Sequence, residues 1–264
     1  MSDDSLIRPD PWQMLRQHTR ARIALGRVGS SLPTREVLEF GVAHALARDA
    51  VHLPLDTEAL QERIEAVGFD VMQVASRAAD RHTYLLRPDF GRRVAPDDVS
   101  RLRVAATAPG PDLLLVVGDG LSSLAVTRQV PALLAELKAN WPDGWRSGPV
   151  VVAQQARVAL ADEVGEALGA RMVAMLIGER PGLTAPDSLG VYLTWSPRVG
   201  CNDAQRNCIS NIRPEGLSHA AAAHKLLWLA REAKRLQLTG VALKDESDVL
   251  EIGGDDAKMQ IERP

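Results

Sequence analysis

The sequence is short of cysteine and lacks any long apolar run. Cys201 and Cys208 are its two cysteines and no CxxC spacing occurs, which argues against a disulfide scaffold and a cysteine zinc site. No apolar run approaches the ~20 residues that span a bilayer. The polar, acidic start MSDDSLIRPD differs from a secretory signal. We therefore expect a protein of a reducing compartment, the cytoplasm, with no membrane partner.

The chain also lacks the basic excess of a general nucleic-acid binder. Its net charge at pH 7 is −3 and its isoelectric point is near 6.1, so no nucleic-acid partner is expected. Apolar residues make up 45% and charged residues 25%, as in soluble globular proteins. The 264 residues allow one large domain, or a main domain with an appendage.

Common nucleotide-binding and hydrolase signatures are missing. The stretch Gly118-Asp119-Gly120-Leu121-Ser122-Ser123 differs from the dinucleotide fingerprint, the phosphate loop and the GxSxG nucleophile elbow. It predicts a strand end, a glycine turn and a helix start. The amides there either hold an anion or polar ligand, or belong to an ordinary capped helix. The six histidines have no zinc-ligand spacing, so we expect no metal site.

The first 69 residues have the pattern of a helical appendage. Asp10-Pro11 predicts a helix start and Gly26 its end. A second helix is expected after Pro33, and a third from Asp56 to the stop at Gly68. From Pro11 to Arg35 there are five arginines and no acid, and these arginines are either merely solvated or dock on an acidic partner. These arginines are Arg16, Arg20, Arg22, Arg27 and Arg35.

Residues 70–244 have the pattern of an α/β domain. Segments 70–75 and 83–86 are rich in strand formers and predict a hairpin, and 97–106 predicts a helix. Strands are then expected at 113–117, 150–153, 172–177 and 191–195, alternating with helices at 121–139, 158–168 and 218–238. Pro131 should kink or split the first of these helices. The alternation predicts a mostly parallel sheet with helices on both faces. The acidic residues 245–264 predict a poorly ordered tail.

Polar loops follow four of these expected strands. They hold the Gly118–Ser123 turn, Arg157-Val158, Glu179 after a buried strand, and Cys208 within 196–212. In a parallel sheet these loops would meet in one crevice at the carboxyl edge, where ligands bind in open α/β folds. Glu179 is then either a carboxylate fixed beside a ligand, or half of a solvated ion pair with Arg180.

Cys208 raises an alternative function. In that crevice it could serve as the nucleophile of a self-sufficient hydrolase or transferase, if a base or a cation lowered the pKa of its thiol. No histidine lies in its loop, and His219 is the next one along the chain. A packed or ligand-contacting thiol is the simpler interpretation. A plain nucleotide-binding module is a third reading, disfavoured by the missing phosphate-loop signatures.

Taken together, short motifs in a fixed order resemble the small (light) subunit of ethanolamine ammonia-lyase. They extend from about Trp12 to about Gly240, nearly the whole chain. The matching motifs are Arg20-Ala21-Arg22-Ile23-Ala24-Leu25-Gly26-Arg27, Tyr84-Leu85-Leu86-Arg87-Pro88-Asp89-Phe90-Gly91-Arg92-Arg93, Gly118-Asp119-Gly120-Leu121-Ser122, Arg157-Val158 with Asp162, residues 178–183, Ser196-Pro197-Arg198, and Cys208-Ile209-Ser210-Asn211-Ile212.

The resemblance implies a Rossmann-like domain with a helical N-terminal region. It implies a non-catalytic subunit that closes one side of an adenosylcobalamin held against a large catalytic subunit. That large subunit is a TIM barrel, and the assembly is a higher hetero-oligomer that converts ethanolamine and similar vicinal amino alcohols to an oxo compound, acetaldehyde from ethanolamine, and ammonia by radical chemistry. By resemblance the cofactor contacts fall on Val158 through apolar packing, Glu179 through hydrogen-bond acceptance, and Cys208 through loop contact.

Two further expectations accompany the resemblance. Family members destined for bacterial microcompartments carry an amphipathic N-terminal targeting extension, whereas here about ten polar residues precede the first expected helix. The family thus allows a microcompartment location, but the sequence shows no such targeting extension. Asp80-Arg81-His82-Thr83-Tyr84-Leu85 departs from the DxHxxG motif of proteins whose histidine ligates cobalt, so the cofactor should keep its own base as lower ligand.

Overall fold

Four parallel strands and an antiparallel pair form one mixed sheet. The computed structural model describes residues 6–248. The strand order is β1-β3-β2-β4-β5-β6, in which β1, β3, β2 and β4 are parallel, and β5 and then β6 add antiparallel. The α/β class is confirmed, but the parallel character covers only part of the sheet. The strands are β1 (Val71–Ala75), β2 (Leu113–Gly118), β3 (Val150–Gln154), β4 (Met172–Gly178), β5 (Leu189–Trp195) and β6 (Arg206–Ile212).

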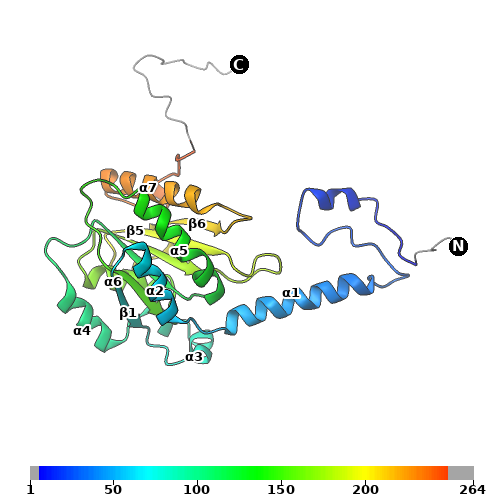
Figure 1. Cartoon of the computed structure of the whole chain (residues 1–264), viewed down its shortest axis with the longest axis horizontal. Coiled ribbons are helices and arrows are strands. Elements are labelled where there is room, and N and C mark those ends of the chain that lie inside the picture. The colour runs from blue at the N-terminus through cyan, green and yellow to red at the C-terminus, as the bar shows by residue number, and fades with distance from the viewer. Residues whose placement is uncertain (1–5, 249–264) are drawn as a thin grey trace, which may run out of the picture.

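Helices cover both faces of the parallel part (Figure 1). One face packs on α2 (Thr57–Val67), α5 (Ser123–Ala139) and α7 (His219–Leu236). The other packs on α4 (Pro96–Ala105) and α6 (Leu160–Ala167). Every residue of β2 and β4 is buried, as expected for strands covered on both faces. Short 3-10 turns lie at Gln13–Gln17, Phe90–Arg92, Asp203–Gln205 and Gly240–Ala242.

The prediction that residues 70–75 and 83–86 pair as a hairpin is wrong. The first segment is a strand, but β1 pairs in parallel with β3. The second belongs to α3 (Arg81–Leu86), where the Asp80 carboxylate accepts a hydrogen bond from the Thr83 amide at 2.7 Å. Such a cap favours a helix over a strand. Tyr84 of this helix is fully buried, and its hydroxyl donates to the Ala156 carbonyl at 2.9 Å.

The direction of β5 corrects the expected parallel sheet. Only residues 179–188 separate β4 from β5, too few for the helical crossover that a parallel neighbour needs. The strand therefore turns back along β4, and its carboxyl end reaches the opposite edge, where the Ser196 amide donates to the Arg171 carbonyl at 2.8 Å. Cys208 then lies in β6 rather than in a loop at the crevice.

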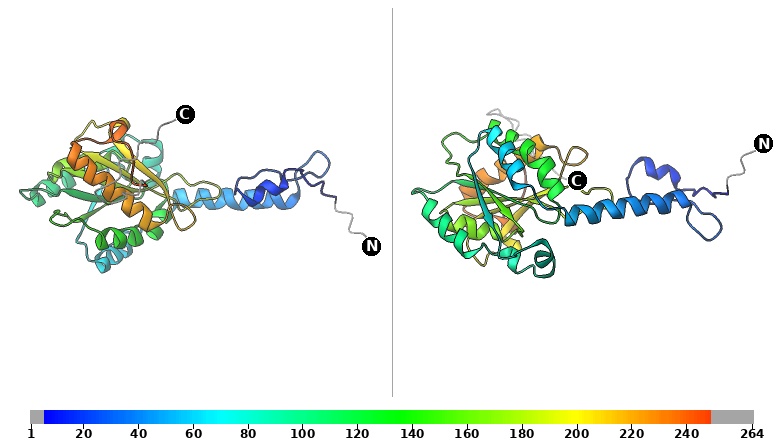
Figure 2. Two further views of the ribbon diagram at one scale, coloured as in Figure 1. Left: turned by 90° about the horizontal axis from the view of Figure 1, so that it is seen from above. Right: turned by 60° about the horizontal axis from the view of Figure 1, so that its bottom comes forward.

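The N-terminal region departs most from expectation. Residues 11–26 do not form the expected helix and hold only the 3-10 turn Gln13–Gln17. An isolated antiparallel β-bridge between the backbones of Arg8 and Arg27 closes this segment into a loop. The expected second helix is present as α1 (Thr34–His52), which projects from the sheet domain with the N-terminal segment at its far end (Figures 1 and 2). The expected third helix, α2, is confirmed with its Asp56 and Gly68 caps.

The division of the chain at residue 69 stays a prediction, and α2 packs with the sheet domain. Pro131 does not split α5, which continues through it. Of the expected tail 245–264, residues 249–264 lie outside the described part. Asp245 and Asp248 form ion pairs with Lys225 at 3.3 and 2.7 Å.

Candidate functional site

The loops after β2, β3 and β4 meet at one cavity, as the sequence predicted for three of the four loops. The cavity has a volume of about 440 Å³. Its wall combines residues of these loops and of the end of β4 with one residue from α3 and one from β5. They are Gly120, Leu121, Arg157, Val158, Ile177, Gly178, Glu179, Arg180, Tyr84 and Tyr192. Val158 and Glu179 therefore lie in the same wall.

Glycine allows the loops after β2 and β4 to touch backbone to backbone. The Leu121 amide donates to the Gly178 carbonyl at 3.0 Å, and Gly120 has a φ of +56°. A Cβ at Gly178 would overlap the Ser122 and Asp119 carbonyl oxygens. Side chains at these two positions would force the loops apart, so both glycines are required for the shape of the cavity.

The Ser122–Ser123 helix start is used inside the protein. The Ser122 hydroxyl accepts from the Ala125 amide at 3.1 Å and donates to the Pro186 carbonyl at 2.7 Å. The Ser123 hydroxyl donates to the Leu53 carbonyl at 2.7 Å. These bonds favour the capped-helix interpretation of this motif over an anion site.

Asp119 fastens the loop after β3. Its carboxylate accepts from the Ala156 amide at 2.9 Å and pairs with Arg81 at 3.1 Å. Burial raises the pKa of Asp119, while the guanidinium of Arg81 and the surrounding backbone amides oppose that rise. The hydrogen bond from the Ala156 amide therefore fixes the start of the loop that carries Arg157 and Val158, and the ion pair with Arg81 holds the Asp119 carboxylate in place for it.

Glu179 is held with one carboxylate oxygen engaged and one open. Its Oε2 accepts from the Ser188 hydroxyl and, at 3.4 Å, from the Asn211 amide. In residues 6–248 its Oε1 has no hydrogen-bond donor, and no ion pair joins Glu179 to Arg180. Glu179 is half-buried and directly follows the buried strand β4. It is therefore a positioned acceptor rather than the solvated half of an ion pair.

Cys208 reaches the same region from β6. It pairs across the strands with Tyr192, which lines the cavity. Cys208 is exposed as a residue, but the protein atoms around its sulfur partly desolvate the thiol, and with the nearby Glu179 charge they raise its pKa, although a hydrogen bond with Tyr192 opposes this. Burial likewise raises the pKa of the Tyr192 hydroxyl. A thiol with a raised pKa is a poor nucleophile at neutral pH, which argues against the Cys208 hydrolase alternative.

Val158, Glu179 and Cys208 thus gather around Tyr192, a residue that sequence reasoning missed. The alternation of side chains between the two faces of a strand could have identified it. Val191 and Leu193 are buried in the core beneath α5 and α7, so the residue between them must point to the other face. On that face α4 and α6 cover the parallel strands, and Tyr192 packs at the edge of their core.

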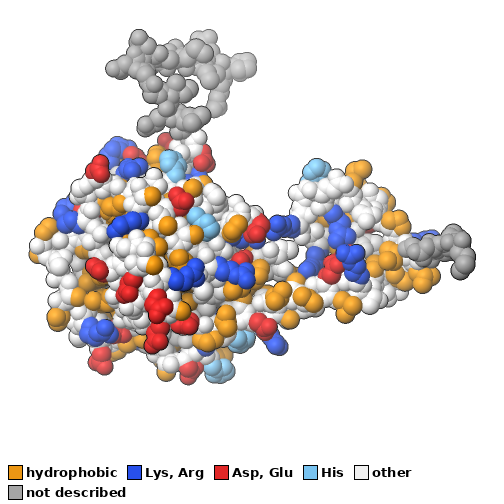
Figure 3. Space-filling model, in the orientation of Figure 1, with side chains coloured by type: hydrophobic (Ala, Val, Ile, Leu, Met, Phe, Trp, Pro, Cys, Tyr) orange, Lys and Arg blue, Asp and Glu red, His pale blue; other side chains and the backbone are white. Residues whose placement is uncertain are grey.

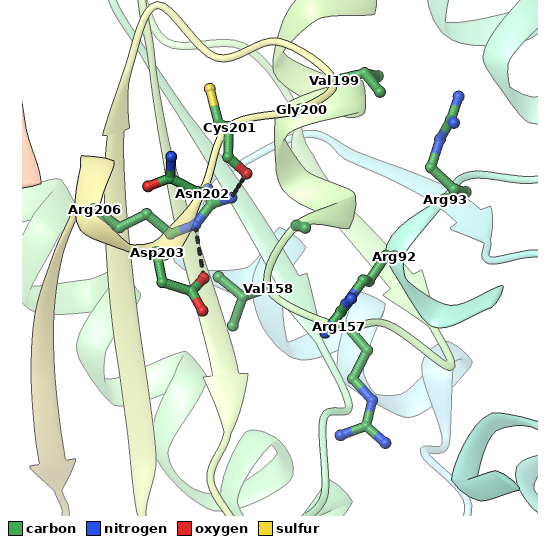
Figure 4. A pocket seen from close by; sticks show the side chains of 11 residues that line it. Arg92, Arg93, Arg157, Val158, Val199, Gly200, Cys201, Asn202, Asp203 and Arg206 are labelled. Carbon is green, nitrogen blue, oxygen red and sulfur yellow. Dashed lines mark hydrogen bonds and ion pairs between the residues drawn. The ribbon is translucent and has the colours of Figure 1, made fainter. Parts of the chain in front are cut away.

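A second cavity of about 500 Å³ adjoins the first, because Arg157 and Val158 line both (Figure 4). Its wall also includes Arg92, Arg93, Arg206 and the segment 199–203. Arg206 is fully paired: its guanidinium bonds both carboxylate oxygens of Asp162, at 2.6 and 2.7 Å. This buried pair fixes the floor of the cavity.

Two other site types find no support in residues 6–248. No group of three or more His, Cys, Asp or Glu side chains in that part of the chain is arranged to hold a metal ion. Among the same residues, no helix combines the length and apolar character needed to cross a membrane.

Comparisons with known proteins agree on one family. The family model described as ethanolamine ammonia-lyase light chain (EutC) matches residues 9–244. The ethanolamine ammonia-lyase small subunit of Azotobacter vinelandii is 57% identical over 257 residues, covering 96% of this chain and 95% of that protein. The small subunit of Pseudomonas putida GB-1 is 58% identical over 245 residues, covering 91% and 90%. The chain belongs to the ethanolamine ammonia-lyase light-chain family.

Proposed function

We propose that this chain completes the adenosylcobalamin site of an ethanolamine ammonia-lyase without taking part in the chemistry itself. The observation that carries the proposal is the convergence of Val158, Glu179 and Cys208 around Tyr192, on loops and strands that start from one sheet. The cavity is open and small beside a corrin ring, so the chain offers one wall. The catalytic large subunit, a TIM barrel in this family, supplies the other.

The wall fits the periphery of the cofactor. Val158, Ile177 and the Tyr192 ring offer apolar surface, and Glu179 Oε1 is a free acceptor for an amide or hydroxyl of the ligand. Cys208 does not line the cavity itself but lies beside it on β6, opposite Tyr192. When bound, the cofactor supplies the radical chemistry, while the protein binds, orients and shields it.

The projecting arm, residues 6–52, is the proposed docking surface for the large subunit. Only two of the 19 residues of α1, Ala43 and Ala50, are buried. Large apolar side chains along it are exposed, as Figure 3 shows over this helix: Val37, Leu38, Phe40, Val42 and Leu46. A patch of this kind marks an interaction site.

The arm and the cofactor wall belong to one continuous surface. An apolar hollow of about 350 Å³ lies between Leu38, Val42 and Leu46 of α1 and Leu183 of the β4–β5 loop. That loop begins at Glu179, so a partner seated on α1 would also approach the cavity. A higher hetero-oligomer and a cytoplasmic location complete the proposal.

Two of the five arginines are partly neutralised by α1 itself. Arg16 pairs with Glu36 at 3.2 Å and Arg35 with Glu39 at 2.7 Å. Their mutual repulsion is therefore weaker than the spacing of acids in the sequence suggests. We therefore base the docking proposal on the exposed apolar side chains of α1 rather than on the arginines.

Co-expression with the cognate large subunit tests the proposed function. The purified pair should produce acetaldehyde from ethanolamine when adenosylcobalamin is added, and the chain alone should not. Turnover by the pure chain, or a pair that neither assembles nor binds cobalamin, would overturn the proposal.

A further inference from the structure

The two cavities carry more positive charge than the acidic side chains of residues 6–248 neutralise. Three arginines near them have acidic partners: Arg81 pairs with Asp119 at 3.1 Å, Arg93 with Glu163 at 2.8 Å, and Arg206 with Asp162 at 2.6 Å. Arg92 and Arg157 have no acidic partner within residues 6–248. Neighbouring like charges raise the electrostatic energy of the cavity wall, and an anion would lower it.

Arg157 is held in place by its stem and by an aromatic face. Its guanidinium lies 4.3 Å from the centre of the Tyr84 ring, and its amide donates to the Gly91 carbonyl at 2.7 Å. A Cβ at Gly91 would press on both the Tyr84 ring and the Arg157 side chain. Gly91 therefore lets the turn at 90–92 clamp the arginine against Tyr84. The charge is positioned before any ligand arrives.

Among residues 6–248 the guanidinium of Arg157 also finds no hydrogen-bond acceptor. Its Nε is buried and has no acceptor in the described part of the chain. In Figure 4 its side chain extends away from the Arg206 cluster, so it does not share that acid. A buried donor without an acceptor is costly. A guanidinium offers five donors in a planar fork that suits a phosphate or a carboxylate.

We propose that Arg157, assisted by Arg92, binds the phosphodiester in the nucleotide tail of the cofactor. This inference rests on the proposed function. The side chains around the corrin ring of adenosylcobalamin are neutral amides, and the phosphodiester is its one peripheral anion. Arg157 lies where the two cavities join. The first cavity takes the edge of the ring, and the second takes the tail that hangs from it.

The test is a binding cycle on the assembled two-subunit complex. Affinities for adenosylcobalamin and for adenosylcobinamide, which lacks the phosphate, the ribose and the base, are measured by equilibrium dialysis. Arg157→Gln should weaken adenosylcobalamin binding by about 10- to 100-fold, as expected for loss of a hydrogen bond between charged groups. It should leave adenosylcobinamide binding within about 2-fold, because the anion is missing from that ligand. Adenosylcobinamide phosphate regains only the phosphate. The variant should again bind this ligand more weakly than the wild type does.

Two further variants support the cycle. Arg92→Gln alters an exposed side chain on the cavity wall and should give a smaller, phosphate-dependent loss of about 3-fold. Arg103→Gln removes the same charge from exposed α4, outside both cavities, and should change neither affinity. If Arg157→Gln misfolds, the Arg92→Gln measurements still test the proposal. A loss of affinity confined to the ligands that carry the phosphate would support it there too, and an equal loss for all ligands would contradict it.

The outcomes separate the inference from the function on which it rests. Equal weakening of both ligands by Arg157→Gln would overturn the inference, since Arg157 would only shape the wall. Failure of the Arg157→Gln subunits to assemble would also overturn it, because an acid of the large subunit would then be the partner. A wild-type complex that binds no corrinoid would overturn the proposed function itself.

Discussion

The parallel part of the sheet and the α1 arm differ in how much of their apolar surface this chain covers. In α5, nine of 17 residues are buried against the strands and α7, whereas in α1 two of 19 are buried. Helix propensity alone does not stabilise a helix of this length well in water, so α5 is supported by its own chain and α1 is not. We call the sheet with the helices that cover it the closed part, and the arm, residues 6–52, together with the cavity wall around Glu179 the open part. The closed part should set the stability of the chain, and the open part should set its partners and ligand.

The largest expected effect is a loss of stability in the closed part. Leu134 of α5 is fully buried, so Leu134→Ala should lower the free energy of unfolding by about 2 to 5 kcal/mol. Leu46→Ala in α1, where the side chain is 56% exposed, should change it by less than about 0.5 kcal/mol. Urea denaturation of the isolated chain measures both. Equal losses would show that α1 is packed in solution.

The open part should respond in assembly instead. Leu38→Asp with Leu46→Asp places two charges in the apolar hollow beside α1 and should weaken binding to the large subunit by roughly 10- to 100-fold. Val104→Asp is the control, because Val104 of α4 is exposed to the same solvent but lies outside the arm. Titration calorimetry gives both affinities, and an unchanged value for the double variant would remove the arm from the interface.

Glu179 tests whether the open wall acts on binding or on chemistry. Glu179→Gln removes the charge of a free acceptor and should raise the KM for adenosylcobalamin by about 10- to 150-fold. Because the cofactor periphery does not change charge during the reaction, kcat at saturation should stay within a few-fold. Steady-state kinetics of the assembled complex measure both, with exposed Glu58→Gln as the control. A loss confined to kcat would make Glu179 a catalytic residue.

The closed part was predicted from the sequence better than the open part. The apolar runs of β2, β3 and β4 and their loops have a local signal, because a buried strand reads as a short hydrophobic run. The direction of β5 has no such signal, and parallel and antiparallel strands share one pattern. The antiparallel direction of β5 follows only from the short connection 179–188. Because of that direction, Cys208 lies in β6 rather than in a loop.

The rest of the site depends on contacts between distant segments. Tyr84 reaches Arg157 only because Asp80 turns residues 81–86 into a helix rather than a strand. The pairings of Arg81 and Arg93 join residues 38 and 70 positions apart, which no local pattern reveals. The unpaired state of Arg157 becomes visible only once those pairs are known. The family resemblance supplied Val158, Glu179 and Cys208, whereas the geometry added Tyr192 and gave Arg157, already named in a predicted loop, its proposed role.

The smallest expected effect concerns acid stability in the closed part. Burial raises the pKa of Glu163, but the bonds to Arg93 and to the Val94 amide outweigh it, so the pKa is lowered from its usual value. An acid with a lowered folded pKa adds stability that is fully present above the unfolded pKa and is lost as the pH falls through the folded one. Glu163→Gln should therefore cost about 1 kcal/mol at pH 7, because Arg93 is partly exposed. The difference in unfolding free energy between the variant and the wild type should disappear between about pH 5 and pH 3. Urea denaturation across that range measures the difference, and Glu62→Gln, at an exposed position of α2, should show none. A difference that persists at pH 3 would mean that the glutamate packs rather than pairs.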